Sequence, residues 1–190
     1  GSDDIDVLFR PTNKKDEQNL HPIRIPLDKG LLGYRICLIN NDDSDKLANI
    51  KTLADLQKLK IGQGRDWNDV LVYQHNKIPV ITGAIYEGLF EMLSKKRFDV
   101  FPRGIQEAYV EYDDRIKTHP NLVVDSHLLI HYPFVRYMWV ANSDKGKQLS
   151  QRLQLGLETI IADGTFDRLF EERYGKDIAR AQLEKRHIIT

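Results

Sequence analysis

Residues 59–69 read LKIGQGRDWND and pass from a short apolar strand into a polar turn that leads to a helical pattern. A strand that ends in glycine and continues directly into a helix is a unit of an α/β fold. The pattern recurs at residues 98–105, FDVFPRGI, which lead into a second helical stretch. The two stretches predict neighbouring parallel strands whose ends carry polar side chains.

The rest of the chain continues this alternation of strands and helices. Apolar runs predict strands at residues 5–9, 23–27, 34–39, 59–62, 79–82, 98–101, 122–124, 128–130 and 135–140. Caps and helical periodicity predict helices at residues 52–56, 67–75, 86–95, 105–115, 144–162 and 166–174, with Gly175 ending the last one. This order predicts an α/β fold with a mainly parallel sheet, and no flexible linker divides the chain.

Charge and cysteine content exclude several classes of protein. Lys plus Arg and Asp plus Glu each number 28, so no basic surplus favours nucleic acid or an anionic membrane. A lone cysteine, Cys37, allows no disulfide within one chain and is expected to be a buried thiol. No apolar stretch approaches the roughly 18 residues of a membrane helix. Gly1-Ser2 is typical of a removed expression tag, so the missing signal peptide carries no information.

The glycines at 62 and 64 do not form a nucleotide-binding loop. A dinucleotide site needs a third glycine, and a phosphate loop needs Gly-Lys-Ser/Thr, and both are missing. What remains is a helix start with Arg65, Asp66 and Trp67, where free backbone amides suit an anionic ligand group. The alternative is that Asp66 caps the helix and Trp67 packs into the core.

The second strand end contributes Arg103 and Glu107. Adjacent strand ends of a parallel sheet open on one edge, where ligands bind, so Arg103 is expected on the same rim as Arg65. An arginine can bind a carboxylate with two donors, and replacing Arg103 by Ala is expected to weaken binding without lowering the stability of the free protein. Arg103 as a solvated surface side chain and Glu107 as a helix-start carboxylate are the alternatives.

No pattern for catalysis, a metal or a cofactor is present. The sequence has no Gly-x-Ser-x-Gly, and Cys37 has no catalytic context. His127 and His131 stand four apart in a strand-like segment, a spacing that keeps them too far apart to share a metal ion. We therefore expect neither enzymatic activity nor a bound metal or cofactor.

Four segments resemble a known family when they are taken in order. Residues 53–62 (LADLQKLKIG), 88–100 (GLFEMLSKKRFDV) and 156–169 (GLETIIADGTFDRL), together with residues 5–9 (IDVLF) and the nearby Thr12, are similar to the amino-acid-binding branch of periplasmic solute-binding proteins. The resemblance runs over nearly the whole chain, and it is the order of the segments that makes it specific.

The resemblance implies a type II periplasmic-binding-protein-like α/β fold: two lobes joined by two crossing strands, here residues 34–39 and 135–140. Residues 1–40 and 132–190 would form a first lobe that is truncated at its N-terminus, and residues 41–131 would form the second lobe. The ligand would lie between Arg10 and Thr12 of the first lobe and Arg65, Asp66, Trp67, Arg103 and Glu107 of the second. Export to the periplasm and delivery to a membrane permease are also implied.

Two departures from the family bear on the ligand. Gln18 stands near the place of the family's carboxylate-binding arginine, and Gly104 stands near the place of its amine-binding acid. The two arginines of the second lobe favour a small polar or anionic solute instead. A sensor domain of a membrane receptor kinase or cyclase, and an enzyme of unknown type, remain alternatives. The truncated lobe is further expected to promote self-association.

Overall fold

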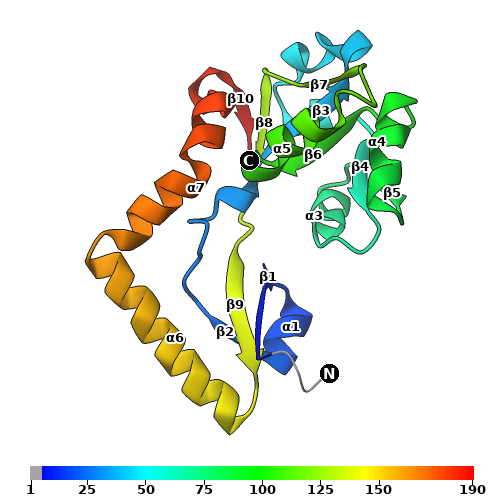
Figure 1. Ribbon diagram of the computed structural model, residues 1–190. Helices are drawn as coiled ribbons and strands as arrows, with labels where there is room; N and C mark the ends of the chain where they lie inside the picture. The colour runs from blue at the N-terminus through cyan, green and yellow to red at the C-terminus, as the bar shows by residue number, and fades with distance from the viewer. Residues whose placement is uncertain (1–5) are drawn as a thin grey trace. The chain divides into compact units, whose positions relative to one another are not determined.

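The computed structural model describes residues 6–190, so Ile5 of the first predicted strand lies outside the described residues. The chain divides into two compact units (Figure 1). The smaller unit comprises Gly1–Gly33 and Pro133–Lys176, and the larger unit comprises Tyr34–Tyr132 and Asp177–Thr190. Each unit is therefore built from two separate stretches of sequence.

The chain passes from one unit to the other beside the two strands that were expected to cross. Strand β3 (Tyr34–Asn40) lies in the larger unit and follows one passage, and β9 (Arg136–Ala141) lies in the smaller unit and follows another. A third passage falls within helix α7 (Thr165–Ala181). The compact units thus differ from the predicted lobes in two places. Strand β3 and the C-terminal segment Asp177–Thr190 belong to the larger unit, whereas both were predicted in the first lobe.

The larger unit is built on a mixed sheet with strand order β10-β8-β3-β6-β4-β5, and β7 also pairs with β3. Besides β3, its strands are β4 (Ile61–Gly64), β5 (Val80–Gly83), β6 (Val100–Gly104), β7 (Leu122–Val124), β8 (Leu128–His131) and β10 (His187–Ile189). Strand β4 is parallel to β5 and β6, and β10 is parallel to β8. Strand β3 is antiparallel to β6, β7 and β8. The parallel pairs are therefore confined to two places in the sheet, and the prediction of a mainly parallel sheet was wrong because β3 enters its middle in the antiparallel sense.

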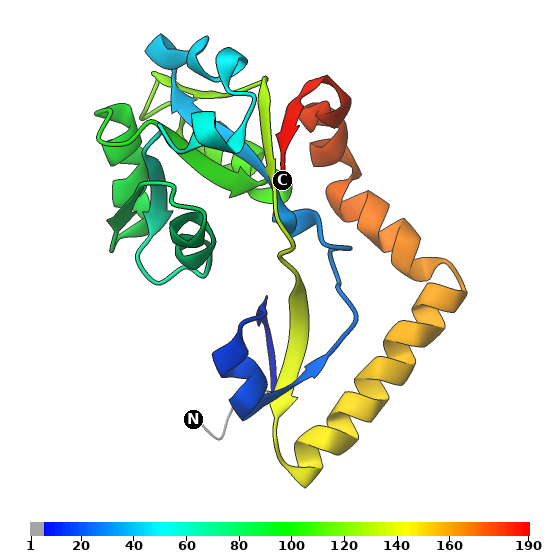
Figure 2. The same ribbon diagram turned by 180° about the vertical axis from the view of Figure 1, so that it is seen from behind.

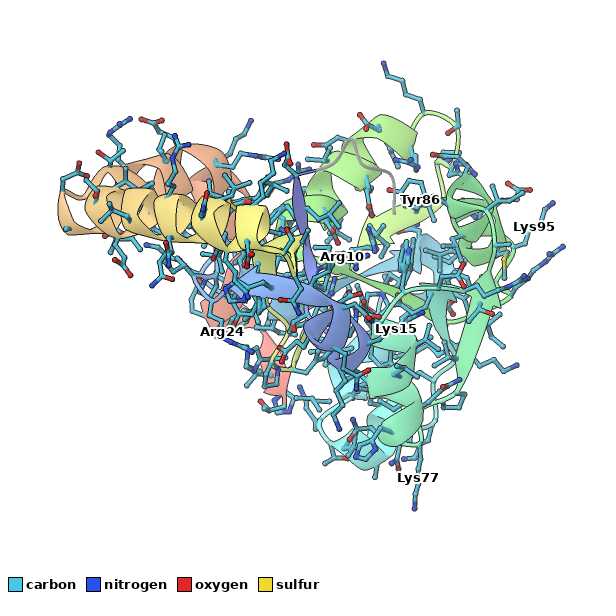
Figure 3. All side chains as sticks on the ribbon, turned by 90° about the horizontal axis from the view of Figure 1, so that it is seen from below. Arg10, Lys15, Arg24, Lys77, Tyr86 and Lys95 are labelled. Atoms are coloured by element: carbon cyan, nitrogen blue, oxygen red, sulfur yellow. The ribbon has the colours of Figure 1, made fainter. Side chains whose placement is uncertain are left out.

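Helices of the larger unit are α2 (Leu53–Leu56), α3 (Asp69–His75), α4 (Tyr86–Ser94) and α5 (Ile105–Arg115), with 3-10 turns at Asn41–Asp43, Lys46–Asn49 and Leu183–Lys185. Helix α4 turns Leu89, Phe90 and Leu93 into a core with Leu38 and Phe101 of the sheet. The whole of β3 after Tyr34 is buried, which explains its continuous apolar pattern. Lys77 and Lys95 project away from the ribbon of this unit (Figure 3).

The smaller unit has a three-stranded antiparallel sheet, order β1-β9-β2, in the part of the chain that is described. Its elements are β1 (Val7–Pro11), α1 (Lys14–Asn19), β2 (Leu20–Ile23), a 3-10 turn at Leu31–Gly33, β9, α6 (Asp144–Ala162) and the start of α7. Ile23 and Val140 of the sheet pack with Leu157 of α6. Figure 2 shows this unit from behind. Among the described residues, three strands and α6 therefore support the core of this unit.

Three local predictions were wrong. The strand expected at residues 23–27 lies earlier, at Leu20–Ile23, behind a short helix α1 that the sequence analysis missed. Helix α7 runs through Gly175 to Ala181, since a glycine inside a helix costs only about 1 kcal/mol relative to alanine. Strand β10 was also missed; it is three residues long and forms by pairing with β8. Across residues 6–190, no helix is both long enough and apolar enough to cross a membrane.

Candidate functional site

Three neighbouring strands of the larger unit, β4, β5 and β6, all end in glycine. Gly64 ends β4 because the indole of Trp67 folds back onto it, and a Cβ at this position would collide with the ring. The backbone N–H of Arg65 donates to Gly83 O at 2.9 Å, and that of Trp67 donates to Gly64 O at 3.1 Å. Gly64 thus serves both a tight turn and a close aromatic contact.

The amides expected to bind an anion after Gly64 are therefore partly used by the turn. Helix α3 begins only at Asp69, and Asn68, not Asp66, occupies its N-cap position, without a side-chain hydrogen bond. Arg65 and Asp66 are exposed, and within residues 6–190 their side chains form no hydrogen bond or ion pair. The helix-start anion site therefore stays a prediction, with Arg65 as an unpaired cation at the strand end.

Arg103 is neither a solvated surface side chain nor an unpaired one, because it is buried and bound to two carboxylates. Its Nε and Nη2 donate to the two carboxylate oxygens of Glu111 at 2.7 and 2.6 Å, and Nη2 also lies 3.2 Å from Oε2 of Glu107. The guanidinium stacks 4.5 Å from the centre of the Trp67 ring. Burial alone would lower the pKa of Arg103, but the carboxylates of Glu107 and Glu111 outweigh it and raise the pKa.

This pairing corrects the expectation for Arg103→Ala. Removing the arginine would leave the Glu111 carboxylate buried without its partner, and such changes cost about 3–5 kcal/mol. The variant is therefore expected to lower the stability of the free protein. Within residues 6–190, the Nη1 group of Arg103 forms no hydrogen bond, so this edge of the guanidinium remains for another partner.

Glu107 joins two buried arginines. Its Oε2 accepts the backbone N–H of Gly104 at 3.0 Å and lies 3.5 Å from Nη1 of Arg35. With 27% of its side chain exposed, Glu107 is more open to solvent than Arg35, Arg103 or Glu111. It is therefore both a helix-start carboxylate and a charged group that a ligand could reach.

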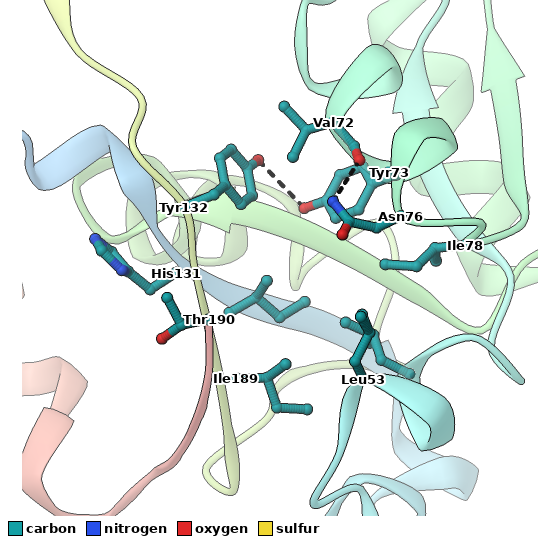
Figure 4. A pocket seen from close by; sticks show the side chains of 11 residues that line it. Leu53, Val72, Tyr73, Asn76, Ile78, His131, Tyr132, Ile189 and Thr190 are labelled. Atoms are coloured by element: carbon teal, nitrogen blue, oxygen red, sulfur yellow. Dashed lines mark hydrogen bonds between the residues drawn. The ribbon is translucent and has the colours of Figure 1, made fainter.

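A second buried network lies behind Glu107. Arg35 forms a 2.7 Å ion pair with Asp69, which accepts the Tyr132 hydroxyl at 2.6 Å. The Tyr73 and Tyr132 hydroxyls lie 3.3 Å apart (Figure 4). Burial raises the pKa of both phenols. The larger unit contains the stretch Tyr34–Tyr132, and Arg35 and Tyr132 lie at its two ends. This network therefore holds the chain in place close to two of the points where it passes between the units.

The pocket of Figure 4 lies beside this network and has a volume of about 50 Å³. It is mainly apolar, and its lining includes Leu53, Tyr73, Ile78 and Tyr132. None of the ligand-binding residues predicted from the sequence lines it. The charged cluster at the strand ends, not this pocket, is therefore the candidate site.

The two predicted residues of the smaller unit are occupied within that unit. Arg10 is exposed on β1 and pairs with Asp16, and the Thr12 hydroxyl donates to Glu17 at 3.0 Å. Of the predicted residues, the structure brings together Trp67, Arg103 and Glu107. Glu111, Arg35 and Asp69 were not predicted from the sequence. The one signal was the charge of Arg35 inside an apolar strand.

No group of three or more possible metal ligands gathers among residues 6–190. His131 instead stacks on Tyr34, and His127 contacts Asp125 at 3.0 Å. These two histidines thus have local packing and hydrogen-bonding roles.

Comparisons with known proteins give matches in structure but not in sequence. No family model matches the chain, and no curated protein matches it significantly. An ancestral arginine-binding protein bound to arginine superimposes with a TM-score of 0.62 at 16% identity, over 90% of this chain and 72% of that one. A periplasmic His/Glu/Gln/Arg/opine family-binding protein from Silicibacter pomeroyi in complex with lysine gives 0.63 at 11% identity, over 93% and 72%.

A third match is the amino acid ABC transporter substrate-binding protein AbpA from Streptococcus pneumoniae bound to L-arginine, with a TM-score of 0.60 at 13% identity, over 88% of this chain and 66% of that one. The chain thus spans roughly two thirds to three quarters of the length of these proteins. It has the type II solute-binding fold, as the resemblance in sequence implied.

Proposed function

We propose that this chain binds a small polar solute outside the cytoplasm, for uptake by a membrane transporter. The fold is that of binding proteins whose names include arginine, glutamine and lysine as ligands. The observation that carries the proposal is the cluster of Trp67, Arg103 and Glu107 at the glycine ends of β4 and β6. It combines an aromatic face, a guanidinium edge and a partly exposed carboxylate.

The charges of the cluster indicate the kind of ligand. The two arginines Arg35 and Arg103 face three carboxylates, so the site has no surplus of positive charge. The carboxylates are those of Asp69, Glu107 and Glu111. A simple anion would gain only the Nη1 edge of Arg103 and the exposed Arg65. A polar or zwitterionic molecule, which gives Glu107 a donor and Arg103 an acceptor, fits better than a bare anion.

The direct test is isothermal titration of the protein with L-arginine, L-lysine, L-glutamine and L-glutamate, together with a thermal shift. A bound ligand at a hundredfold excess over its Kd stabilises the fold by about 2.7 kcal/mol. Glu107→Gln removes the charge and keeps the shape, and loss of a charged hydrogen bond, worth about 1.5–3 kcal/mol, predicts binding weakened tenfold or more. Glu158→Gln on the exposed face of α6 is the matched control.

The proposal is refuted if none of the four amino acids binds. It is also refuted if the Glu107→Gln variant binds them with the same affinity as the wild type. Turnover of a bound ligand would instead indicate an enzyme. One structural match is the reason to test for turnover. It is an ancestral amino-acid-binding protein described as a precursor of cyclohexadienyl dehydratase, with a TM-score of 0.64 at 16% identity.

We also propose Arg10 and Thr12 as ligand-binding residues of the smaller unit. Both side chains have acidic partners within that unit, so the proposal needs Asp16 and Glu17 to yield to a ligand. Thr12→Val removes the hydroxyl and keeps the shape of the side chain. Weaker binding of the same amino acids by this variant supports the assignment, and unchanged binding removes Thr12 from the site.

Self-association is proposed for the smaller unit. Strands β1 and β2 are the edges of its sheet among the described residues, and Phe9 on β1 is 45% exposed. Edge strands with apolar side chains pair readily with a second copy. Light scattering is expected to give a mass above that of the monomer, and Phe9→Lys is expected to restore the monomer mass. A monodisperse wild-type monomer would refute the proposal.

A further inference from the structure

Two glutamines beside the candidate site have no complete set of hydrogen bonds. Gln63 on β4 is fully buried and Gln106, in the first turn of α5, is 7% exposed. Within residues 6–190, Oε1 of Gln63 and both Oε1 and Nε2 of Gln106 have no hydrogen-bond partner. Buried amides in proteins are nearly always paired, so these three atoms call for an explanation.

Both side chains lie against the end of β6. Nε2 of Gln63 donates a long bond of 3.4 Å to Pro102 O. The amide atoms of Gln106 lie 3.0–3.2 Å from the place that a Cβ on Gly104 would occupy. Gly104 therefore leaves room for the Gln106 amide, one residue away from Glu107 and its bond to the Gly104 N–H.

Packing alone does not account for a glutamine at position 106. An apolar side chain of the same length would fill this space without burying an unpaired donor and acceptor, and an unpaired polar group is costly. A group that is unsatisfied in the free protein is instead ready to pair with a ligand. The two amide atoms are covered, so this pairing requires the Gln106 side chain to rotate about its flexible torsions.

We propose that Gln106 is the specificity-determining residue of the candidate site, with Gln63 behind it, and that it selects ligands whose side chain carries both a donor and an acceptor, as a carboxamide does. This inference rests on the proposed function. An amide on the ligand satisfies both Oε1 and Nε2 of Gln106. A carboxylate offers only acceptors and meets the charge of Glu107, and a thioether offers no strong partner.

The prediction is that L-glutamine binds at least tenfold more tightly than L-glutamate or L-methionine, which match it closely in size. Tenfold corresponds to about 1.4 kcal/mol. Gln106→Met keeps the length of the side chain and removes the amide. It is expected to weaken L-glutamine binding at least tenfold, to leave L-methionine binding unchanged, and to keep or raise the melting temperature of the free protein.

Gln57→Met is the matched control. Gln57 is half-buried, and its Nε2 donates to Asn76 O at 2.9 Å, so this amide is satisfied within the fold. The control is expected to lower the melting temperature and to leave the affinity for L-glutamine unchanged.

The outcomes separate this inference from the proposed function. If the wild type binds none of the amino acids, the proposed function fails and the inference fails with it. If the wild type binds one of them and Gln106→Met binds it equally well, the site stands and Gln106 is not its specificity residue. If Gln106→Met also lowers the melting temperature as Gln57→Met does, its amide is a structural group satisfied by ordered water.

Discussion

Arg103 and Glu111 form a buried two-pronged ion pair, with Nε–Oε2 and Nη2–Oε1 distances of 2.7 and 2.6 Å and only 9% of each side chain exposed. The pair holds the guanidinium flat against Trp67 and directs its remaining edge, Nη1, away from Glu111. Glu111 thus positions the arginine that the proposed function uses.

The ion pair makes Glu111→Gln informative. The amide oxygen can still accept hydrogen bonds from Arg103 or Tyr86, but the NH₂ group cannot accept and no charge is supplied. A buried charged group with an incomplete set of partners costs at least about 1–3 kcal/mol. Urea denaturation is expected to show this loss. Glu91→Gln, at an exposed pair with Lys95, should cost less than about 1 kcal/mol. Equal losses for the two variants would mean that the Arg103–Glu111 pair contributes no more than a surface pair.

Alkaline pH is expected to destabilise the protein through Tyr73 and Tyr132. Burial raises the pKa of both phenols in the folded state, so the folded state holds these protons more tightly than the unfolded chain. Their contribution is complete below the unfolded pKa near 10 and is lost as the pH rises through the folded pKa. The melting temperature should therefore fall above about pH 9.5.

Tyr132→Phe tests this assignment. Without its phenol, the fall of the melting temperature with pH should be shallower than in the wild type. Tyr174→Phe, a change on α7 where the ring packs on Phe170, should leave the slope as it was. An unchanged slope for Tyr132→Phe would remove this phenol as a cause.

Cys37 is expected to be inert in the folded protein. The thiol is fully buried in β3, and burial raises its pKa, so little reactive thiolate forms at pH 8. A chromogenic disulfide reagent should label it within minutes after denaturation and far more slowly beforehand. Rapid labelling of the native protein would show that β3 opens locally.

The sequence predicted those elements whose signals are local. Helix α2 follows from its capping box, in which Thr52 Oγ1 accepts the Asp55 N–H at 3.1 Å and Asp55 accepts the Thr52 N–H at 3.1 Å. The periodicity of α5 and α6 gave their observed bounds. Strand β10 could not be found in this way, because three residues form a strand there only by pairing with β8.

Only part of the candidate site could be predicted from the sequence. The order of strands and helices alone places residues at strand ends, such as Trp67 and Arg103. The partners of Arg103 depend on how α5 lies on the sheet, which sequence spacing does not specify. The sequence therefore predicted a free ligand-binding arginine at position 103, whereas tertiary packing pairs Arg103 with Glu111.

The most direct test of the account is the indole N–H signal of Trp67 in a ¹⁵N–¹H correlation spectrum, recorded while L-glutamine is added. The chain has two tryptophans, so Trp67→Phe assigns the two signals without ambiguity. Binding at the glycine ends of β4 and β6 predicts that the Trp67 signal shifts with ligand concentration and reaches half of its full shift at the Kd found by calorimetry. A Trp67 signal that stays in place while calorimetry reports binding would contradict the location of the site, and no response by either method to any of the amino acids would contradict the function itself.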